Sequence, residues 1–308
     1  MKRLHYLILL ALAVAPFSSR AADLSAEDKE KIDQALPDKA PAKPRRARKL
    51  LVLNFNRVHV AGAPVVIKPS IPHGNYAIEA MGKKTGAYTS VLSTDIEALR
   101  PENLKQYDAL CFNNTTGVLT EDQVLRDSLL AFVAQGKGFV AFYAGGAVTF
   151  IQVPVYNQFP AFGEMVGGYS GGGHPWYPKD TIYIRVEDPK NPVNAVFKGQ
   201  EFPIQEQVMQ FRKPYSREKL HVLLSIVVEK SDYDPEKRRI NAERRADKDF
   251  PMSWIKTYHK GRVFYTVFGA NPPSFLNPQL LQHYLAGIQY ALGDLKADDT
   301  PSARFGNR

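Results

Sequence analysis

Two apolar strands flank one amphipathic helix in the middle of this chain, and this pattern constrains the fold more than any other. Asp108-Ala-Leu-Cys-Phe112 and Gly138-Phe-Val-Ala-Phe-Tyr143 are nearly continuous apolar runs, as expected for strands buried on both faces of a parallel sheet. Between them, Thr120 and Gln123 form a capping box for a helix that ends at Gly136. Strand, helix and strand at this spacing imply a right-handed crossover. The sequence therefore predicts an α/β three-layer sandwich with an open, mainly parallel sheet.

The rest of the chain continues this alternation over a length that suits one domain, 49–295. A buried strand is predicted at Lys49-Leu-Leu-Val-Leu-Asn-Phe55, and a helix over 76–84 ends at Gly86. The remaining predicted elements are strands at 88–92, 182–186, 222–228, 252–256 and 263–267 and a last helix at 279–292. Residues 296–308 are expected to form a disordered tail.

The first 21 residues have the pattern of a signal peptide. A short basic region precedes the apolar run Leu7-Ile-Leu-Leu-Ala-Leu-Ala-Val14, which is too short to span a bilayer, and Ser19-Arg-Ala21 is a small-x-small cleavage site. The alternative is an uncleaved membrane anchor. We predict a signal peptide at 1–21, a periplasmic or secreted mature protein, and no membrane contact after cleavage.

The formal net charge of +9 is locally clustered. Residues 22–48 carry many lysines and arginines in a Pro/Ala-rich stretch and are expected to form a flexible basic linker. A second basic run, at 237–245, shares its segment with acids and is expected to be a charged loop. Basic runs can bind nucleic acid, but no nucleic-acid-binding motif accompanies either run. We therefore predict no nucleic-acid partner.

Metal and cofactor motifs are missing from the sequence. It contains no H-E-x-x-H or C-x-x-C, and the glycines of Gly167-Gly-Tyr-Ser-Gly-Gly-Gly173 lack the spacing of a dinucleotide or phosphate loop. We therefore expect no metal site and no cofactor.

Ligands of open α/β sheets bind beyond the carboxyl ends of the strands, which selects four segments. They are the loop after Phe55, the turn Tyr143-Ala-Gly-Gly146, the stretch Gly171-Gly-Gly-His-Pro-Trp176 and the turn Gly269-Ala-Asn-Pro-Pro273. Their aromatic side chains can stack on sugar rings, although they can equally belong to the core of a large domain. These segments form the predicted cleft.

Three stretches resemble the ThuA-like (trehalose-utilisation) family: Gly136-Lys-Gly-Phe-Val-Ala-Phe-Tyr143, Gly173-His-Pro-Trp176, and the segment from Trp254 to Gly269. The resemblance runs over about residues 49–295. It implies a fold similar to class I glutamine amidotransferases, a flavodoxin-like sandwich. It also implies a role near carbohydrates, such as disaccharides oxidised to keto-sugars.

Several positions depart from the family pattern. Where such families carry G-I-H-x-x-x-D, this chain has Tyr143 in place of the histidine and Ala147 in place of the acid. The pattern D-E-x-Y appears as Glu206-Gln-Val-Met209, G-H becomes Gly269-Ala270, and Lys68 stands where relatives have a histidine. The strand-to-helix elbow also lacks the cysteine of an amidotransferase, which excludes that activity.

The remaining polar residues define the candidate site. We predict catalytic roles for His174, Glu206 and Tyr143, because a histidine exchanges protons near neutral pH and a carboxylate can orient it or act as a base. The predicted substrate-binding residues are His73, Lys68, Trp176, Gln207 and Asn271. Structural roles are the alternatives: His174 packed beside its tryptophan neighbour, Glu206 paired with Arg212 or a nearby lysine, and His73 as a helix-entry residue.

The sequence supports two alternative functions. The first is an exported enzyme that acts on a disaccharide or keto-sugar by acid–base chemistry at an altered cleft. The second is a catalytically inactive carbohydrate-binding or scaffold protein. The sequence allows a homo-oligomer and leaves the substrate and reaction type open.

Overall fold

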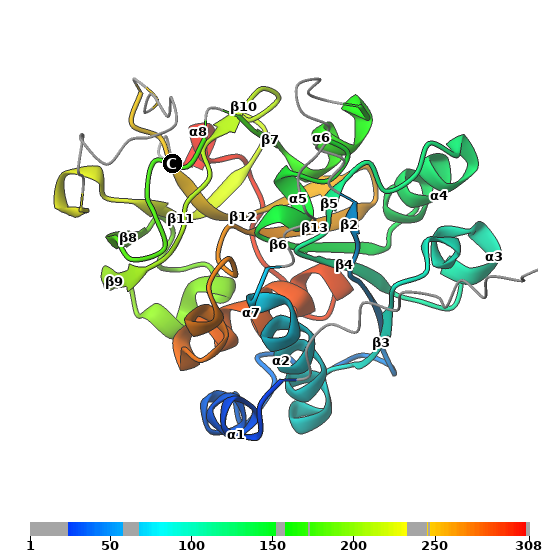
Figure 1. Cartoon of the computed structure of the whole chain (residues 1–308), viewed down its shortest axis with the longest axis horizontal. Coiled ribbons are helices and arrows are strands. Elements are labelled where there is room, and N and C mark those ends of the chain that lie inside the picture. The colour runs from blue at the N-terminus through cyan, green and yellow to red at the C-terminus, as the bar shows by residue number, and fades with distance from the viewer. Residues whose placement is uncertain are drawn as a thin grey trace, which may run out of the picture.

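A nine-stranded mixed sheet with helices on both faces forms the core of the protein (Figure 1). The computed structural model describes residues 24–57, 68–151, 158–171, 173–232, 245 and 247–305. The predicted α/β three-layer sandwich is confirmed, with a parallel core flanked by helices. The strands at the other end of the sheet are antiparallel.

The sheet divides into a parallel and an antiparallel half. The parallel half contains, in spatial order, β3 (Thr89–Ser93), β1 (Lys49–Leu53), β4 (Ala109–Asn113), β6 (Gly138–Phe142) and β13 (Gly261–Thr266). The antiparallel half continues with β12 (Pro251–Tyr258), β11 (His221–Ile226), β8 (Thr181–Val186) and β9 (Phe202–Gln205). Two short pairs are β2 (Asn56–Arg57) with β5 (Thr116–Gly117), and β7 (Tyr169–Ser170) with β10 (Phe211–Arg212).

Helices cover both faces of the sheet. One face is covered by α2 (Ser70–Thr85) and α7 (Pro278–Leu292), with α1 (Ala26–Ala35) packed against α2. The opposite face carries α4 (Gln123–Ala134) and α6 (Pro160–Val166), which lie above the sheet in Figure 1. The short helices are α3 (Pro101–Leu104), α5 (Ala144–Ala147) and α8 (Ser302–Phe305), with 3-10 turns at Ile96–Leu99, Pro192–Phe197, Val228–Lys230 and Pro272–Phe275.

The central crossover forms as the sequence predicts, apart from its helix cap. Every residue of β4 and β6 is buried, in keeping with their continuous apolar runs. However, α4 begins two residues later than the capping box implied. The carboxylate of Asp122 accepts a hydrogen bond from the Val124 amide at 2.8 Å, whereas the Thr120 hydroxyl accepts from the Asp122 amide. Thr120 therefore shapes the turn before the helix, and the prediction that it is the N-cap is wrong.

The segment 24–48, predicted to be a flexible linker, is instead packed on the domain. Helix α1 buries Ile32 and Ala35 against α2, and both backbone groups of Ala42 bond to the side-chain amide of Gln289 at 2.9 and 2.7 Å. The linker prediction is wrong for the described residues because their charges and backbone groups find specific partners that composition does not reveal.

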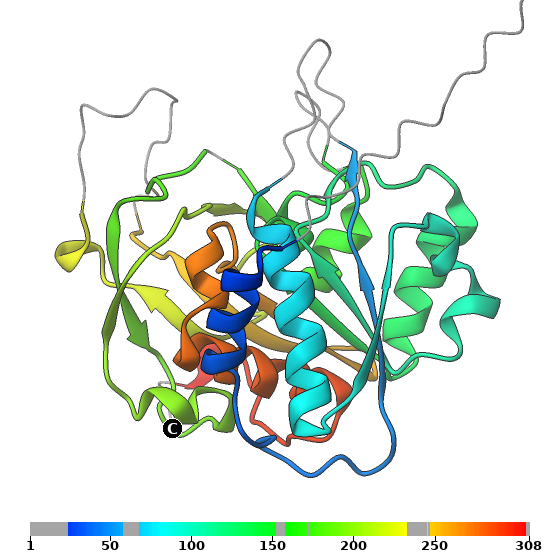
Figure 2. The ribbon, with the colours of Figure 1, turned by 60° about the horizontal axis from the view of Figure 1, so that its bottom comes forward.

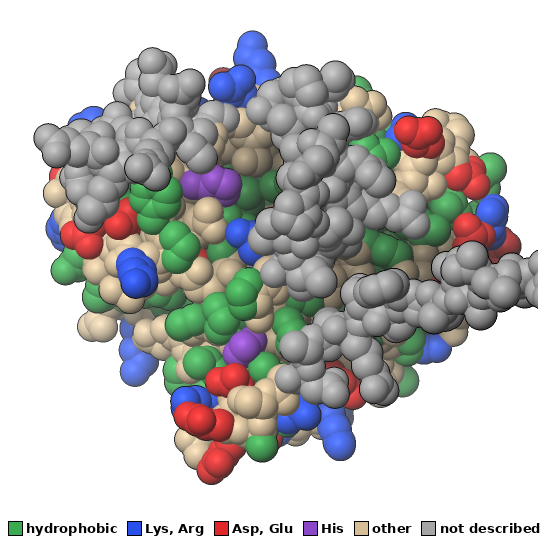
Figure 3. All heavy atoms as spheres, in the orientation of Figure 1, with side chains coloured by type: hydrophobic (Ala, Val, Ile, Leu, Met, Phe, Trp, Pro, Cys, Tyr) green, Lys and Arg blue, Asp and Glu red, His purple; other side chains and the backbone are tan. Residues whose placement is uncertain are grey.

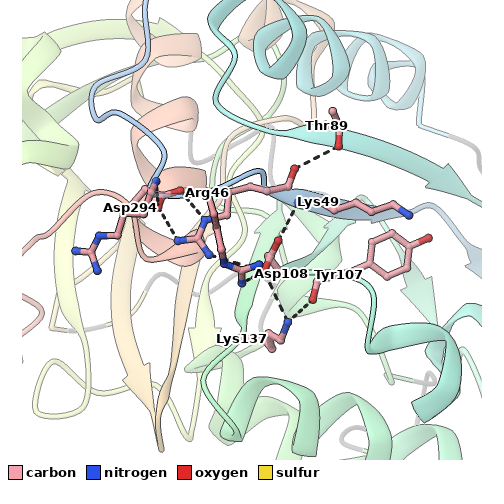
Figure 4. A network of polar contacts seen from close by, with 9 residues as sticks. Arg46, Lys49, Thr89, Tyr107, Asp108, Lys137 and Asp294 are labelled. Atoms are coloured by element: carbon pink, nitrogen blue, oxygen red, sulfur yellow. Dashed lines mark hydrogen bonds and ion pairs between the residues drawn. The ribbon is translucent and has the colours of Figure 1, made fainter.

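Two buried aspartates hold the basic residues before β1 (Figure 4). Arg48 makes two hydrogen bonds to Asp294, at 2.9 and 2.6 Å, and the Arg46 guanidinium bonds to Asp108. The other carboxylate oxygen of Asp108 accepts from the Lys49 amide at 3.0 Å, and Lys137 lies 3.7 Å from the first. These arginines therefore tie the N-terminal segment to the amino edge of the sheet.

The C-terminal residues up to 305 also contact the domain, so the prediction of a disordered tail is wrong for them. The carboxylate of Asp299 accepts from Thr257 at 2.5 Å and from Tyr290 at 2.6 Å, and the Ser302 amide bonds to the Leu220 carbonyl. The predicted signal peptide lies outside the described residues. Within the part of the chain that is described, no helix has the length and hydropathy needed to cross a bilayer.

Candidate functional site

The carboxyl edge of the sheet gathers the predicted site residues. Strands β1, β4, β6 and β13 are parallel to one another. Four successive antiparallel pairings lead from β13 through β12, β11 and β8 to β9, so β9 runs in the same direction as β13. β1, blue at the right of centre in Figure 2, rises to this edge. Tyr143 follows β6, Glu206 follows β9, and Gly269 lies just beyond β13. Residues 58–67, part of the predicted loop after Phe55, lie outside the described residues.

Glu206 is completely buried, and hydrogen-bond donors surround its carboxylate. One oxygen accepts from the amides of Gln207 at 2.9 Å and Asn271 at 3.1 Å. The other accepts from the Gly269 amide at 3.1 Å and from the Ser274 hydroxyl. Burial raises the pKa of Glu206 to about 7, and these four hydrogen bonds oppose that shift.

This arrangement makes Glu206 an anchor. A carboxylate has about four lone-pair sites, and all of those of Glu206 are occupied by protein donors. It therefore has no acceptor site left for a substrate proton. Its role is to hold the turn 269–274 against the end of β9 and, in its ionised form, to place a buried negative charge beneath the edge.

Lys68 interacts electrostatically with Glu206. Its ammonium donates to the side-chain oxygen of Gln207 at 3.2 Å and lies 5.4 Å from the centre of the Tyr143 ring. Burial lowers the pKa of Lys68, and the negative charge of Glu206 opposes the shift. Lys68, Gln207, Tyr143 and Glu206 thus form one cluster at the carboxyl edge.

Tyr143 occupies a strained elbow between β6 and α5. Its φ is 47° and its ψ is −114°, which is unusual for a residue other than glycine. The bend is tight because the next turn packs closely: a Cβ on Gly145 would lie 2.1 Å from the carbonyl oxygen of Phe112. The Tyr143 carbonyl accepts from the Tyr265 hydroxyl, and its amide donates to Thr266 at 2.8 Å.

The Tyr143 side chain faces the protein interior. It is 1% exposed, its hydroxyl has no hydrogen-bond partner among the described residues, and burial raises the pKa of the phenol. The ring therefore forms the floor beneath Lys68 and presents no acid or base to solvent.

His174 is half-buried in the stretch that precedes β8. Burial and, to a lesser extent, the positive charge of Lys68 together lower its pKa to about 4. The imidazole is therefore neutral at neutral pH and can accept a proton. No hydrogen bond joins His174 to Glu206 within the described structure, so Lys68 is the residue that couples electrostatically to both.

Histidine and hydrophobic side chains lie open to view on the face that carries this edge (Figure 3). Four polar residues of the edge are partly exposed: Lys68, His174, Gln207 and Asn271. The Asn271 side chain donates to the Pro178 carbonyl at 3.0 Å, which joins the turn after β13 to the segment before β8. These residues present polar groups at the carboxyl edge.

Two predicted binding residues have structural roles instead. The ring nitrogens of His73 lie 3.2 Å from the Pro69 carbonyl and 3.5 Å from the carboxylate of Asp28 in α1. Trp176 is fully buried, stacks edge-to-face on Phe250 and donates its N–H to the Asp232 carbonyl at 2.6 Å. A buried indole has no face for a sugar, so we leave Trp176 and His73 out of the site.

Sequence reasoning missed Ser274 and the asparagines at the end of β4. Ser274 donates to Glu206, and the Asn114 side chain donates to the Gly269 carbonyl at 3.1 Å. Asn113 donates to Ile71 and Asn75 of α2. The two asparagines could have been identified from the sequence, because they form a polar pair at the end of an apolar strand. The described residues hold no group of three or more metal-ligating side chains.

Known proteins give the same picture of the fold. A family model described as "ThuA: Trehalose utilisation" matches residues 58–291. A ThuA-like protein from Bacteroides uniformis is 19% identical with a TM-score of 0.59, covering 80% of this chain and 94% of that one. A ThuA-like protein from Parabacteroides merdae is 13% identical with a TM-score of 0.54, covering 83% of this chain and 93% of that one.

A β-galactosidase from Bacillus circulans shares the fold over part of its length. It is 15% identical with a TM-score of 0.51, and the match covers 89% of this chain but 35% of the galactosidase chain. No curated protein matches this chain. At these identities the structural matches establish the fold alone.

Proposed function

Because the chain belongs to the ThuA family, described as trehalose utilisation, we propose that it binds a disaccharide or keto-sugar at the carboxyl edge and transfers a proton through His174. The observation that carries the proposal is a neutral, half-buried imidazole beside a lysine and a ring of hydrogen-bonding groups at the edge where ligands of such sheets bind. Lys68, Gln207 and Asn271 supply hydrogen bonds to the sugar in this proposal.

His174 acts as the proton acceptor in this scheme. With its pKa lowered to about 4, the ring is unprotonated throughout the neutral range and is a weak base that carries the proton only transiently. Glu206 does not take part in proton transfer, because its oxygens are occupied. It fixes the turn that carries Asn271 and supplies the negative charge that partly balances Lys68.

Binding without turnover is the second candidate. Two observations favour it: Glu206 has no free acceptor site, and Tyr143 is buried at the elbow where the family resemblance implies a histidine. In that case the same edge holds a sugar but lacks a second proton-transfer group.

Turnover distinguishes the two candidates. Purified protein is incubated with trehalose and with trehalose oxidised at one secondary hydroxyl, and products are followed by mass spectrometry. An enzyme forms a product, and His174→Ala lowers the rate by about a hundredfold or more. His259→Asn is the matched control, because His259 is exposed in the hairpin between β12 and β13 and asparagine tolerates its φ of 52°. Binding of either sugar without product supports the second candidate, and no binding rejects both.

We also propose that the mature protein acts outside the cytoplasm. The proposal rests on the signal-peptide pattern of residues 1–21. Amino-terminal sequencing of protein from the periplasmic fraction should give a start near Ala22. Recovery of an intact Met1 from the cytoplasm would contradict export.

A further inference from the structure

Lys68 occupies an unusual position for a lysine. Its half-buried ammonium has one hydrogen-bond acceptor among the described residues, the neutral side-chain oxygen of Gln207 at 3.2 Å, and no carboxylate lies within 4.0 Å of it in that part of the structure. The nearby anion, Glu206, is occupied by its four protein donors. A buried cation without a direct ion pair is destabilised relative to the neutral amine.

The neutral form of lysine is a nucleophile. Lysines that form Schiff bases with carbonyl compounds are activated by desolvation or by a neighbouring cation. Burial lowers the pKa of Lys68 in this way, while the remote charge of Glu206 limits the shift. His174, neutral and electrostatically coupled to Lys68, supplies a proton acceptor near the amine.

We propose that Lys68 forms a Schiff base with a carbonyl group of the ligand, so that the site at the carboxyl edge selects an oxidised keto-sugar over an unoxidised non-reducing disaccharide. This inference rests on the proposed sugar site and names its substrate class. The contact with Gln207 and the Tyr143 ring below fix the amine at the carboxyl edge, where the ligand binds.

The reaction is balanced without an oxidant or reductant. The lone pair of the Lys68 nitrogen attacks the carbonyl carbon, and the carbonyl π electrons move to oxygen. A proton passes from nitrogen to that oxygen, with His174 as the carrier, to give a carbinolamine. Loss of one water then leaves the carbon–nitrogen double bond, and addition of water reverses the step and releases the ligand.

Lys256 offers a matched comparison. Burial lowers its pKa to about 8, yet its ammonium donates to the Glu164 carbonyl at 2.7 Å and it lies toward the far end of β12, away from the carboxyl edge. If a lowered pKa alone governed reactivity, Lys256 would react as well. If position at the carboxyl edge governs reactivity, only Lys68 reacts.

The test is reductive trapping with sodium cyanoborohydride. The mature chain is incubated with trehalose oxidised to a ketone at one ring carbon, or with trehalose itself, and the adduct is located by intact mass and peptide mapping. We expect a single adduct on Lys68 with the ketone, none with trehalose, retention of the adduct in Lys256→Arg and its loss in Lys68→Arg.

Binding of the same ketone, measured by calorimetry without reductant, separates the outcomes. If the ketone binds but no adduct forms on Lys68, or Lys68→Arg is labelled equally, the Schiff-base proposal is overturned and the proposed sugar site stands. If the ketone does not bind to the wild-type chain, the site and the Schiff base are both rejected.

Discussion

Replacement of Glu206 by alanine should destabilise the protein, because four donors lose their acceptor at once. These are the amides of Gln207, Gly269 and Asn271 and the Ser274 hydroxyl. An unsatisfied buried donor costs about 1–3 kcal/mol, and two of these amides are only partly buried, so we take the lower bound for each. The expected loss of unfolding free energy is about 4 kcal/mol. With an unfolding entropy of about 2.1 cal/mol/K per residue, this lowers the Tm of a chain of this size by about 7 °C.

Thermal and denaturant unfolding of Glu206→Ala and Glu206→Gln measure this effect. Glutamine keeps one acceptor oxygen, but its amide nitrogen faces the other two donors. We therefore expect Glu206→Gln to lose about half of the unfolding free energy that Glu206→Ala loses. Glu201→Gln is the control: it lies just before β9 and pairs with exposed Lys230 and Arg185, which is worth about 1 kcal/mol at most. A Tm for Glu206→Ala within about 2 °C of wild type would refute the anchoring role.

Three further predictions concern stability. Burial lowers the pKa of His283 to about 4, so as pH falls the unfolded state of the protein binds a proton at this residue before the folded state does. The free energy of unfolding should therefore decline by about 3 kcal/mol between pH 6.5 and 4 because of this group. His283→Gln should flatten that decline in denaturant titrations. Asp294→Ala leaves Arg48 without its two hydrogen bonds and should cost about 3 kcal/mol in the same assay, with faster proteolysis of residues 24–48; unchanged proteolysis would argue against the anchoring of that segment. Tyr143→Phe removes a hydroxyl without a partner in the described structure and should change stability by less than about 0.5 kcal/mol, whereas a large loss would reveal an undetected partner.

The sheet was predictable where burial is continuous. The runs at β1, β4 and β6 are apolar at successive positions because both sheet faces are covered, and the sequence shows this directly. Helix α1 was missed because Ile32 and Ala35 are its only buried positions in an otherwise charged stretch. Its stability comes from packing on α2.

The site was predictable as a location but less so as chemistry. Strand ends identified the edge that holds Lys68, Tyr143 and Glu206. The role of Glu206 was not accessible, because three of its donors lie 63 to 68 residues further along the chain. Trp176 was predicted to bind substrate, but the backbone bridge from Trp176 to Val208 accompanies a ring that is fully buried in the core.

The central claim is that a sugar binds beside His174 at the carboxyl edge, and selective 15N labelling of the histidines tests it most directly. Without ligand, the His174 ring should titrate with a pKa near 4 and be neutral at pH 7. Addition of trehalose oxidised to the ketone should shift the His174 ring resonances and leave those of exposed His259, in the hairpin between β12 and β13, in place. A shift confined to His259, or no histidine shift at saturating sugar, would contradict the account.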